Sequence, residues 1–394
     1  MSLQLLQLRT TGQCHFLPLL LLLQLVPVLL LLPPSRPASA AAATHLPGFD
    51  GPLPFNLETG YVGVEEETGA ELFYYFIESE RSPGTDPVLL WLTGGPRCSV
   101  IMGLAFEIGP LKFVLAPYSG GLPELVYNPY SWTKMANILL LDSPVGSGFS
   151  YARDPKGYDV GDYSSSSQWF TDHPQYLSNP FYIGGDSYAG KVIPLIAQGI
   201  SEGIDMRQQP VIKGYMVGNP ITDPKFDENY KIPSAHGFGI ISDQIYESVV
   251  KNCKGDYVNP VNEMCVEVLH TINNGTTSEW IQCNIGLPYT YELPSSIPYH
   301  LNLTMKGYRA LVYSGDHDLE APFLGTQAWI RSLNFSIVAD WRAWHLSGQA
   351  AGFTIEYTNN MTFAIVKGAG HTAPEYRPKE CFAMAQRWLD NEPL

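Results

Sequence analysis

The stretch FYIGGDSYAGKVIPLIAQGI, residues 181–200, predicts a strand, a tight turn and a helix in immediate succession. The strand is short and apolar, and an apolar repeat at helical spacing begins at Ile193. Between them, residues 185–189 match the pattern G-x-S-x-G with alanine in the last place. Such a turn lifts one serine above the edge of a sheet, beside the N-terminus of a helix. Ser187 is therefore a candidate nucleophile, and an ordinary strand-to-helix turn with a capping serine is the alternative.

A serine nucleophile needs a base to remove its proton and an acid to orient that base. Two later strand-like runs each end in a glycine-containing turn, and these turns carry Asp318 and His371. Serine, aspartate, histidine is the chain order of α/β-hydrolases, so we predict a catalytic triad of Ser187, Asp318 and His371. Asp316 competes with Asp318, but we assign it to capping the turn, because the chain must extend further to face the histidine. His173, which precedes a proline, is expected on the surface.

The predicted reaction also needs two hydrogen-bond donors for the negative oxygen of a tetrahedral intermediate. The backbone N–H of Tyr188, the residue after the nucleophile, is one candidate. The N–H of Gly95 is the other, because an apolar strand ends at two glycines there and leaves amides at the same edge of the sheet. Asp186 and Glu107 are carboxylates within expected reach of this pocket, although Glu107 also suits a structural role in its turn.

The composition describes an acidic chain that can bury a large core. Its 394 residues carry a formal net charge of −15, and 45% of them are hydrophobic. This charge argues against nucleic acid as a partner, and no basic patch stands out. The oligomeric state does not follow from the sequence.

The first forty residues have the pattern of a secretory signal peptide. A basic start precedes an apolar run at 16–32, and an A-x-A end follows at Ala38–Ala40. We expect cleavage near Ala40, with an uncleaved anchor as the alternative. No later stretch is long and apolar enough to span a membrane, so no stable span is expected after cleavage.

Entry into the secretory route permits glycans and disulfides. Four asparagines stand in glycosylation sequons: Asn274, Asn302, Asn334 and Asn360. Cys14 would leave with the signal peptide, and the five remaining cysteines are an odd number. At least one thiol is therefore expected to be unpaired.

These patterns together predict an α/β-hydrolase fold with a mostly parallel central sheet. The alternation of strands and helices is lost between 222 and 306, where prolines, tyrosines and three cysteines gather. We expect a signal peptide at 1–40, a hydrolase core at 41–221 and 307–394, and an inserted cap at 222–306.

Several motifs closely resemble the serine carboxypeptidase-like proteins of plants, from about Leu46 to the end of the chain. These motifs are WLTGGPRCS (91–99), FEIGP (106–110), LLDSPVGSGFSYA (140–152), GGDSYAG (184–190), YSGDHDLEAPFLGTQAWI (313–330) and GAGHTAPEYRP (368–378). The resemblance implies an α/β-hydrolase fold and an enzyme that acts through Ser, His and Asp. We expect neither a cofactor nor a metal.

The resemblance also suggests a branch of the family. Its peptidases typically carry Asn where this chain has Thr93 and Glu where it has Asp186, and these side chains help to bind a peptide's terminal carboxylate. The Thr and Asp pairing resembles the acyltransferases, which move an acyl group from a 1-O-β-glucose ester to an alcohol or amine. A shorter acid and a hydroxyl suit a neutral sugar. Thr93, Gly94, Glu107 and Asp186 are thus expected to bind substrate.

Two alternatives stay open beside the acyltransferase. One is a serine carboxypeptidase acting on peptide C-termini, and the other is a catalytically impaired secreted glycoprotein. The chain departs from the family in having Arg97 where relatives have glycine; at positive φ this costs ~1–2 kcal/mol, and the long side chain would fill the pocket. Relatives also carry several dozen more residues after Asn274, so the cap is expected to be short.

The resemblance further implies two disulfides, Cys98–Cys283 and Cys253–Cys265, with Cys381 as the odd thiol. Relatives are usually vacuolar or extracellular and the acyltransferases serve secondary metabolism, so one of these two compartments is expected.

Overall fold

The computed structural model describes residues 41–117, 120–158, 160–161, 169–203, 210–260, 262–273 and 289–394. The predicted signal peptide, the sequon at Asn274 and the cysteine at 283 lie outside the described residues. From Ala40 onward the chain forms one compact unit. None of the described helices is long and apolar enough to cross a bilayer.

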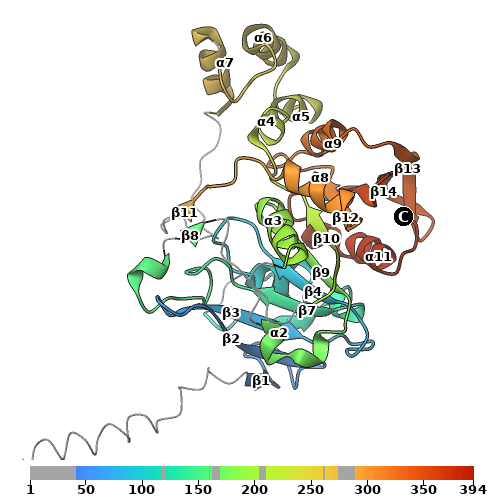
Figure 1. Ribbon diagram of the computed structural model, residues 1–394. Coiled ribbons are helices and arrows are strands. Elements are labelled where there is room, and N and C mark those ends of the chain that lie inside the picture. Colours follow the sequence, from blue (N-terminus) through green and yellow to red (C-terminus); the bar gives the residue numbers. More distant parts are fainter. Residues whose placement is uncertain are drawn as a thin grey trace, which may run out of the picture. The chain divides into compact units, whose positions relative to one another are not determined.

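An 11-stranded sheet runs through this unit in the order β1-β2-β3-β7-β4-β9-β10-β12-β15-β14-β13 (Figure 1). From β7 to β15 neighbouring strands are parallel, and both edges are antiparallel. This is the predicted α/β-hydrolase arrangement. The strands are β1 (Ala41–Ala43), β2 (Leu57–Glu65), β3 (Ala70–Ile77), β4 (Val88–Leu92), β7 (Asn137–Leu141), β9 (Phe181–Asp186), β10 (Ile212–Gly218), β12 (Arg309–Gly315), β13 (Ile337–Leu346), β14 (Gln349–Tyr357) and β15 (Met361–Val366).

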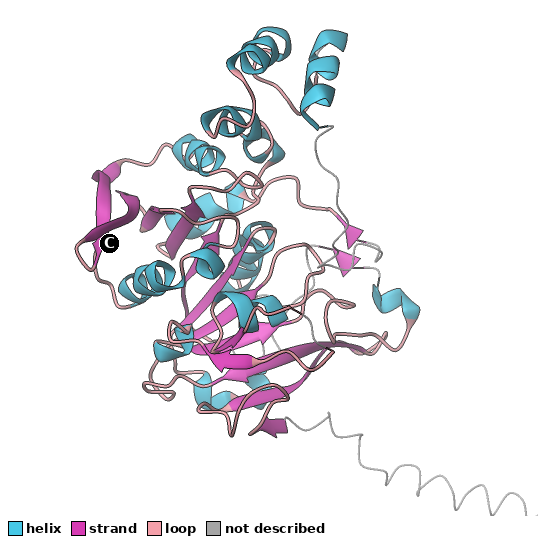
Figure 2. Ribbon diagram, turned by 180° about the vertical axis from the view of Figure 1, so that it is seen from behind, coloured by secondary structure: helices cyan, strands magenta, loops and turns pink. Residues whose placement is uncertain are grey.

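Helices cover both faces of the sheet, which is why its central strands are continuous apolar runs (Figure 2). Within β4, Leu90 and Leu92 belong to one core cluster, while Leu89 and Trp91 belong to the other. The α-helices are α2 (Trp169–Asp172), α3 (Ala189–Ser201), α4 (Pro224–Asp227), α5 (Lys231–Gly237), α6 (Asp243–Cys253), α7 (Glu263–Asn273), α8 (Ile297–Met305), α9 (Phe323–Ser332), α10 (Ala373–Tyr376) and α11 (Pro378–Leu389).

Short elements complete the described chain. Two small strand pairs form outside the main sheet, β5 (Leu111–Phe113) with β6 (Leu125–Tyr127) and β8 (Val160–Gly161) with β11 (Tyr289–Thr290). The short helical turns are η1 (Gly103–Glu107), η2 (Trp132–Lys134), η3 (Pro155–Tyr158) and η4 (Pro174–Tyr176).

The described part of 222–306 contains helices α4 to α8 and contributes no strand to the main sheet. Helices α5 to α7 share a small hydrophobic cluster that includes Ile232 and Val249. The Cys253–Cys265 disulfide expected from the resemblance is present and joins α6 to α7. Helix α8 instead contributes Leu303 to the main core.

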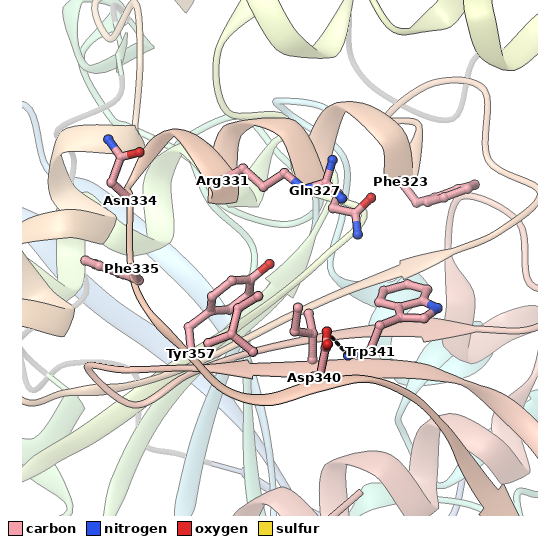
Figure 3. A pocket seen from close by; sticks show the side chains of 10 residues that line it. Phe323, Gln327, Arg331, Asn334, Phe335, Asp340, Trp341 and Tyr357 are labelled. Carbon is pink, nitrogen blue, oxygen red and sulfur yellow. Dashed lines mark hydrogen bonds between the residues drawn. The ribbon is translucent and has the colours of Figure 1, made fainter.

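The hairpin β13–β14 was not predicted from the sequence. Its turn is Ser347-Gly348, and both residues have positive φ (51° and 77°). Strand β13 forms one edge of the sheet. A cavity of about 580 Å³ lies between this hairpin and α9, lined by side chains from both (Figure 3).

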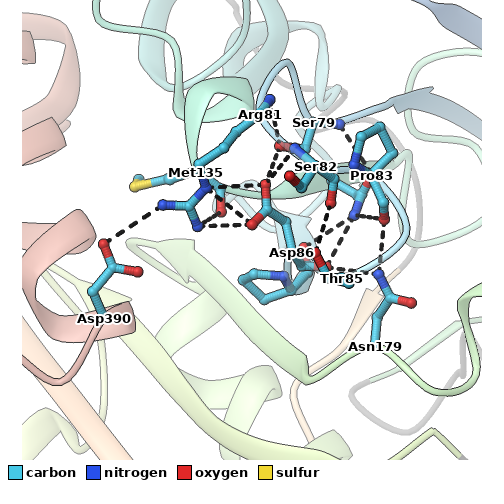
Figure 4. Close-up of polar contacts among 11 residues, drawn as sticks. Ser79, Arg81, Ser82, Pro83, Thr85, Asp86, Met135, Asn179 and Asp390 are labelled. Atoms are coloured by element: carbon cyan, nitrogen blue, oxygen red, sulfur yellow. Dashed lines mark hydrogen bonds and ion pairs between the residues drawn. The ribbon is translucent and has the colours of Figure 1, made fainter.

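A polar network around Asp86 holds the N-terminal ends of three parallel strands (Figure 4). Its carboxylate accepts hydrogen bonds from Ser79 Oγ (2.6 Å) and Arg81 Nη2 (2.8 Å). Its backbone carbonyl accepts from Nδ2 of Asn137, at the start of β7, and of Asn179, just before β9 (3.1 and 2.7 Å). The strands β4, β7 and β9 therefore start in register, and their C-terminal ends meet at the opposite edge of the sheet.

Candidate active site

The turn between β9 and α3 holds Ser187 in a left-handed backbone conformation, with φ of 59°. This conformation is unfavourable for a non-glycine residue, and neighbouring contacts maintain it. The Ser187 N–H donates to Gly218 O, and its carbonyl accepts from Ile221 N, both at 2.9 Å. A Cβ on Gly185 would lie 2.1 Å from Leu92 O, so this position of the turn has to be glycine. The serine is thereby fixed at the C-terminal edge of the sheet.

His371 lies between Ser187 and Asp318. Its Nε2 is 2.8 Å from Ser187 Oγ, and its Nδ1 is 2.8 Å from Asp318 Oδ2. The three residues predicted as a triad thus come together, each after a different parallel strand of the sheet. Asp316, the competing carboxylate, instead accepts a hydrogen bond from Gly368 N at 2.6 Å, as a turn-capping residue does.

The surroundings favour a charged acid and a strong base in this chain of hydrogen bonds. Burial raises the pKa of Asp318, but the hydrogen bond and charge of His371, with further donors, outweigh it and lower this pKa below its usual value. Burial lowers the pKa of His371, but the hydrogen bond and charge of Asp318 raise it above the ordinary 6.5. Asp318 is therefore ionised at neutral pH, as an acid that orients a base must be.

Asn219 supports the triad and was missed by the sequence interpretation. It is fully buried just after β10, with φ of 41°, a conformation that asparagine tolerates better than most residues. Its Nδ2 donates to Asp318 Oδ2 at 2.7 Å, and its Oδ1 accepts from Gly315 N at 3.2 Å. A signal was available, because a Gly-Asn-Pro sequence at 218–220 ends a buried strand.

The loop after β4 lies directly against the serine. A Cβ on Gly94 would be 2.5 Å from Ser187 Cβ and 2.9 Å from its Oγ, so only glycine fits there. Gly95 follows with φ of 127°, a conformation that side chains rarely allow, and a cis bond leads to Pro96. The amides of Gly95 and Tyr188, predicted to bind an oxyanion, therefore belong to the two segments that meet at the serine.

Asp142, which the sequence interpretation did not single out, anchors this loop. Its Oδ1 accepts from Ser99 Oγ (2.8 Å) and Val100 N (2.7 Å), and its Oδ2 accepts from Phe149 N (2.9 Å). The side chain is fully buried, and burial raises its pKa although the hydrogen bonds oppose this. It connects the loop after β4 to the loop after β7, so the glycines near Ser187 have a fixed support.

Two predicted substrate-binding carboxyls are buried beside this loop. Glu107 accepts a hydrogen bond from Trp91 Nε1 at 2.9 Å, which is the structural role considered for it. Asp186, directly before the serine, has no hydrogen-bond partner for either carboxyl oxygen among the described residues, and the same holds for Thr93 Oγ1. Burial raises the pKa of both carboxyls, and the charge of Glu107 raises that of Asp186 further. Buried polar atoms without a partner are uncommon and are suited to binding a ligand.

Arg97 has a positive φ, which is the condition under which the sequence predicts backbone strain at this position. Its φ is 77°, in a region that costs a non-glycine residue ~1–2 kcal/mol. The side chain is 9% exposed, and its Nε has no hydrogen-bond partner in the described part of the chain. Its guanidinium carbon lies 5.9 Å from the ring centre of Tyr289, which packs edge-on against Tyr188. The long side chain is thus buried next to one of the segments that meet at Ser187.

Asn302, Asn334 and Asn360 are exposed. Cys98 is disulfide-bonded, and its predicted partner lies outside the described residues; Cys381 is a free, buried thiol.

The expectation for His173 was wrong. The side chain is buried, with Nε2 2.7 Å from Glu58 Oε1 and Nδ1 3.0 Å from Trp169 O, and its ring stacks on that of Trp169. A histidine before a proline can therefore be a core residue when two acceptors satisfy its ring nitrogens.

A hydrogen-bonded Ser–His–Asp chain at the C-terminal edge of this sheet defines a serine enzyme of the α/β-hydrolase fold. The chain belongs to the serine carboxypeptidase family, whose sequence model matches residues 47–277 and 266–391. Among relatives from Arabidopsis thaliana, serine carboxypeptidase-like 3 is 46% identical over 415 residues, covering 91% of this chain and 94% of the relative. Serine carboxypeptidase-like 4 is 46% identical over 434 residues, covering 95% and 97%.

A solved structure shares the fold. The crystal structure of Kex1(delta)p, a prohormone-processing carboxypeptidase from Saccharomyces cerevisiae, matches with a TM-score of 0.67 and 18% sequence identity. The match covers 86% of this chain and 92% of the yeast chain.

The lengths of the sequence alignments also show that this chain lacks residues that its relatives have. The alignment with serine carboxypeptidase-like 3 spans 415 positions, but 91% of the 394 residues is only about 359, so over fifty positions are empty in this chain. The family match falls into two segments that meet at 266–277. This agrees with the shortening expected after Asn274.

Proposed function

We propose that this enzyme is an acyltransferase that moves an acyl group from a 1-O-β-glucose ester to an alcohol or amine. The observation that carries the proposal is the hydrogen-bonded chain from Ser187 through His371 to Asp318. The buried hydroxyl oxygen of Thr93 and the buried carboxyl of Asp186, which have no hydrogen-bond partner among the described residues, support a sugar ester as the donor.

The reaction proceeds in two steps through an acyl-Ser187 intermediate. In the first step, Ser187 Oγ attacks the ester carbonyl while His371 Nε2 takes the hydroxyl proton, and Asp318 stabilises the imidazolium. The amides of Gly95 and Tyr188 bind the negative oxygen. The intermediate collapses, and His371 returns the proton to the departing glucose oxygen.

In the second step, the acceptor enters and its O–H or N–H gives a proton to His371 as its oxygen or nitrogen attacks the acyl carbon. The proton then returns to Ser187 Oγ as the product leaves. Water competes with the acceptor at this step, so the acyl-enzyme also allows slow hydrolysis.

Donor recognition rests on the unusual protonation of the carboxyl next to the serine. Because burial and the charge of Glu107 raise the pKa of Asp186, this side chain stays neutral over a wider pH range than an exposed aspartate. A neutral acid and the Thr93 hydroxyl can each donate and accept hydrogen bonds with sugar hydroxyls. Neither group needs a charged partner, which suits glucose as the leaving group.

A serine carboxypeptidase is the second candidate, and one observation favours it. Burial also raises the pKa of Glu107, and a protonated Glu107 can donate a hydrogen bond to the terminal carboxylate of a peptide. A catalytically impaired glycoprotein is the third candidate, because the strained and buried Arg97 lies beside a segment that meets Ser187.

One experiment separates the three candidates. The purified glycoprotein and its Ser187→Ala variant are incubated with a set of 1-O-β-glucose esters and acceptors, and in parallel with blocked dipeptides. We expect transfer products and a Ser187 adduct that the variant does not form. Peptide hydrolysis without use of glucose esters would overturn the acyltransferase. Failure of a fluorophosphonate to label Ser187 would support the impaired glycoprotein.

We also infer that the mature enzyme starts near residue 41, after removal of the leader at 1–40, and works in the vacuole or outside the cell. The Cys253–Cys265 disulfide supports an oxidising route. In this interpretation, 41–221 and 307–394 are the catalytic core and 222–306 is a shortened cap. N-terminal sequencing of the protein from its native tissue tests the cleavage site.

A further inference from the structure

The cavity between α9 and the hairpin β13–β14 has two chemically different walls (Figure 3). Helix α9 contributes Phe323, Gln327 and Arg331, which share one face because they are four residues apart. The hairpin contributes mainly apolar and aromatic side chains, among them Trp341 and Tyr357. The volume of about 580 Å³ is within the range of about 300–1,000 Å³ that is usual for small-molecule sites. No triad residue lines this cavity.

The apolar wall belongs to an edge strand. Ile337 and Trp341 of β13 are 52% and 39% exposed, and the ring of Trp341 stacks parallel to that of Phe353 with centres 5.5 Å apart. An exposed apolar edge strand invites pairing with other chains, and proteins usually cover or blunt such edges. In this position, a covering group would lie against a flat aromatic surface.

The polar side chains that line the cavity have unused hydrogen-bond donors and acceptors. Among the described residues, neither Gln327 nor Arg331 makes a side-chain hydrogen bond. On the opposite, hairpin wall, the carboxylate of Asp340 accepts only from the N–H of Trp341 within the described part of the chain. An amide and a guanidinium that face an aromatic surface, with a carboxylate beside that surface, match a saccharide, whose hydroxyls need planar polar partners and whose ring faces are apolar.

Asn334 is on the rim of this cavity and begins the sequon Asn334-Phe335-Ser336. The side chain is exposed and lies just beyond α9, with φ of 56°. An asparagine in this conformation also serves to end a helix. Ending the helix requires the asparagine but not a serine two residues later. That structural role therefore does not explain why Ser336 completes a sequon.

We propose that the cavity holds the core of an N-linked glycan carried by Asn334, with its sugar rings running along the apolar wall from Phe335 toward Trp341. In the modification, Asn334 Nδ2 bonds to the anomeric carbon of the sugar, the lipid diphosphate of the donor leaves, and the amide loses one proton. The attached sugar then starts at the cavity wall. Because it is covalently tethered there, its effective concentration at the cavity is high. It covers the exposed edge of β13.

The test compares release of the glycan in the folded and unfolded protein. The chain is produced in a eukaryotic secretory host that makes high-mannose glycans, and glycopeptide mass spectrometry first measures occupancy at Asn334. An endoglycosidase that cuts between the two core N-acetylglucosamines is then applied. We expect release from Asn334 to be at least about tenfold slower in the native than in the denatured protein, which corresponds to about 1.4 kcal/mol.

Matched variants identify the cavity as the cause of this protection. Trp341→Ala and Arg331→Ala should speed release from the native protein without lowering occupancy, and unchanged circular dichroism shows that each variant folds. Ser336→Ala removes the glycan and should lower the midpoint of thermal unfolding, whereas Ser336→Thr keeps the sequon and should not.

Three results would overturn the proposal. One is an unmodified Asn334 in the secreted protein, and another is release that is as fast from the native as from the denatured state. The third is a folded Arg331→Ala or Trp341→Ala variant whose glycan remains as protected as in the parent protein.

Discussion

Asn219 donates a hydrogen bond of 2.7 Å from Nδ2 to Oδ2 of Asp318. The same oxygen lies 2.8 Å from His371 Nδ1 and accepts from Ala321 N at 3.2 Å, while Glu320 N donates to the other oxygen at 2.8 Å. All of these groups act as donors to the acid, so they stabilise its charged form and fix its direction. The orientation of His371 therefore depends on residues far from one another in sequence.

We expect Asp318→Asn to slow acylation of Ser187 by about 10⁴-fold, because the amide cannot hold the productive tautomer or stabilise the imidazolium. The acid also raises the pKa of His371, so its loss should move the rise of the rate with pH to lower pH. Stopped-flow labelling by a fluorophosphonate measures both the rate and the midpoint of its pH dependence. The pH is varied from about 5 to about 9, which spans the range in which histidine titrates. A slow variant whose pH midpoint is unchanged would contradict this account.

Asn219→Gly should lower the turnover number by on the order of tenfold while leaving KM nearly unchanged. Glycine is chosen because it tolerates the positive φ of this position. KM should change little because His371 and Asp318 lie between the Asn219 side chain and the hydroxyl of Ser187. The lost bond to a charged acid also costs about 1.5–3 kcal/mol of stability. Asn179→Ala is the matched control, because Asn179 is equally buried but belongs to the network around Asp86. If both variants lose turnover alike, Asn219 has no special relation to the triad.

Much of the catalytic centre follows from the sequence because local patterns encode it. The order and strand-end positions of Ser187, Asp318 and His371 depend only on where buried apolar runs stop. Asn219 carries no such pattern, since its importance arises only when β10 and β12 pair and bring it beside Asp318. Asp142 was missed for the same reason, because its partners come from two separate loops.

The limits of the elements were harder to predict than their existence. The short apolar strand predicted before Ser187 continues through two glycines to Asp186. Gly184 and Gly185 add no apolar side chain to the sequence pattern, yet they pack closely against Trp91 and Leu92. The hairpin β13–β14 was missed altogether. Its Ser-Gly dipeptide indicates a turn, but the strands beside it mix exposed apolar and polar residues instead of alternating cleanly.

A comparison of Arg97→Gly with Arg97→Ala should isolate the backbone strain at this position. Both variants remove the side chain that lies over Tyr289, but only glycine relieves φ of 77°. We expect the glycine variant to be more stable than the alanine variant by about 1 kcal/mol, measured by urea unfolding. The two variants should turn over substrate at similar rates if side-chain bulk limits access, and the glycine variant should be faster if loop geometry does. Equal stability of the two variants would show that the position is not strained.

Asp186→Asn should make stability less dependent on pH. Burial and the charge of Glu107 raise the pKa of Asp186 above the ordinary 3.8, so the folded state binds a proton that the unfolded state has already released. Below pH 3.8 both states are protonated and this linkage costs nothing; as the pH rises further, the wild-type chain loses stability until the folded carboxyl ionises. An asparagine does not titrate, so the difference in thermal midpoint, variant minus wild type, should grow as the pH is raised from about 4 to 8. Glu66→Gln, at an exposed turn, is the control for the loss of one carboxylate from the chain. A constant difference for Asp186→Asn would mean that this buried acid is already ionised when the protein folds, and its proposed neutral role in binding a sugar would then fail.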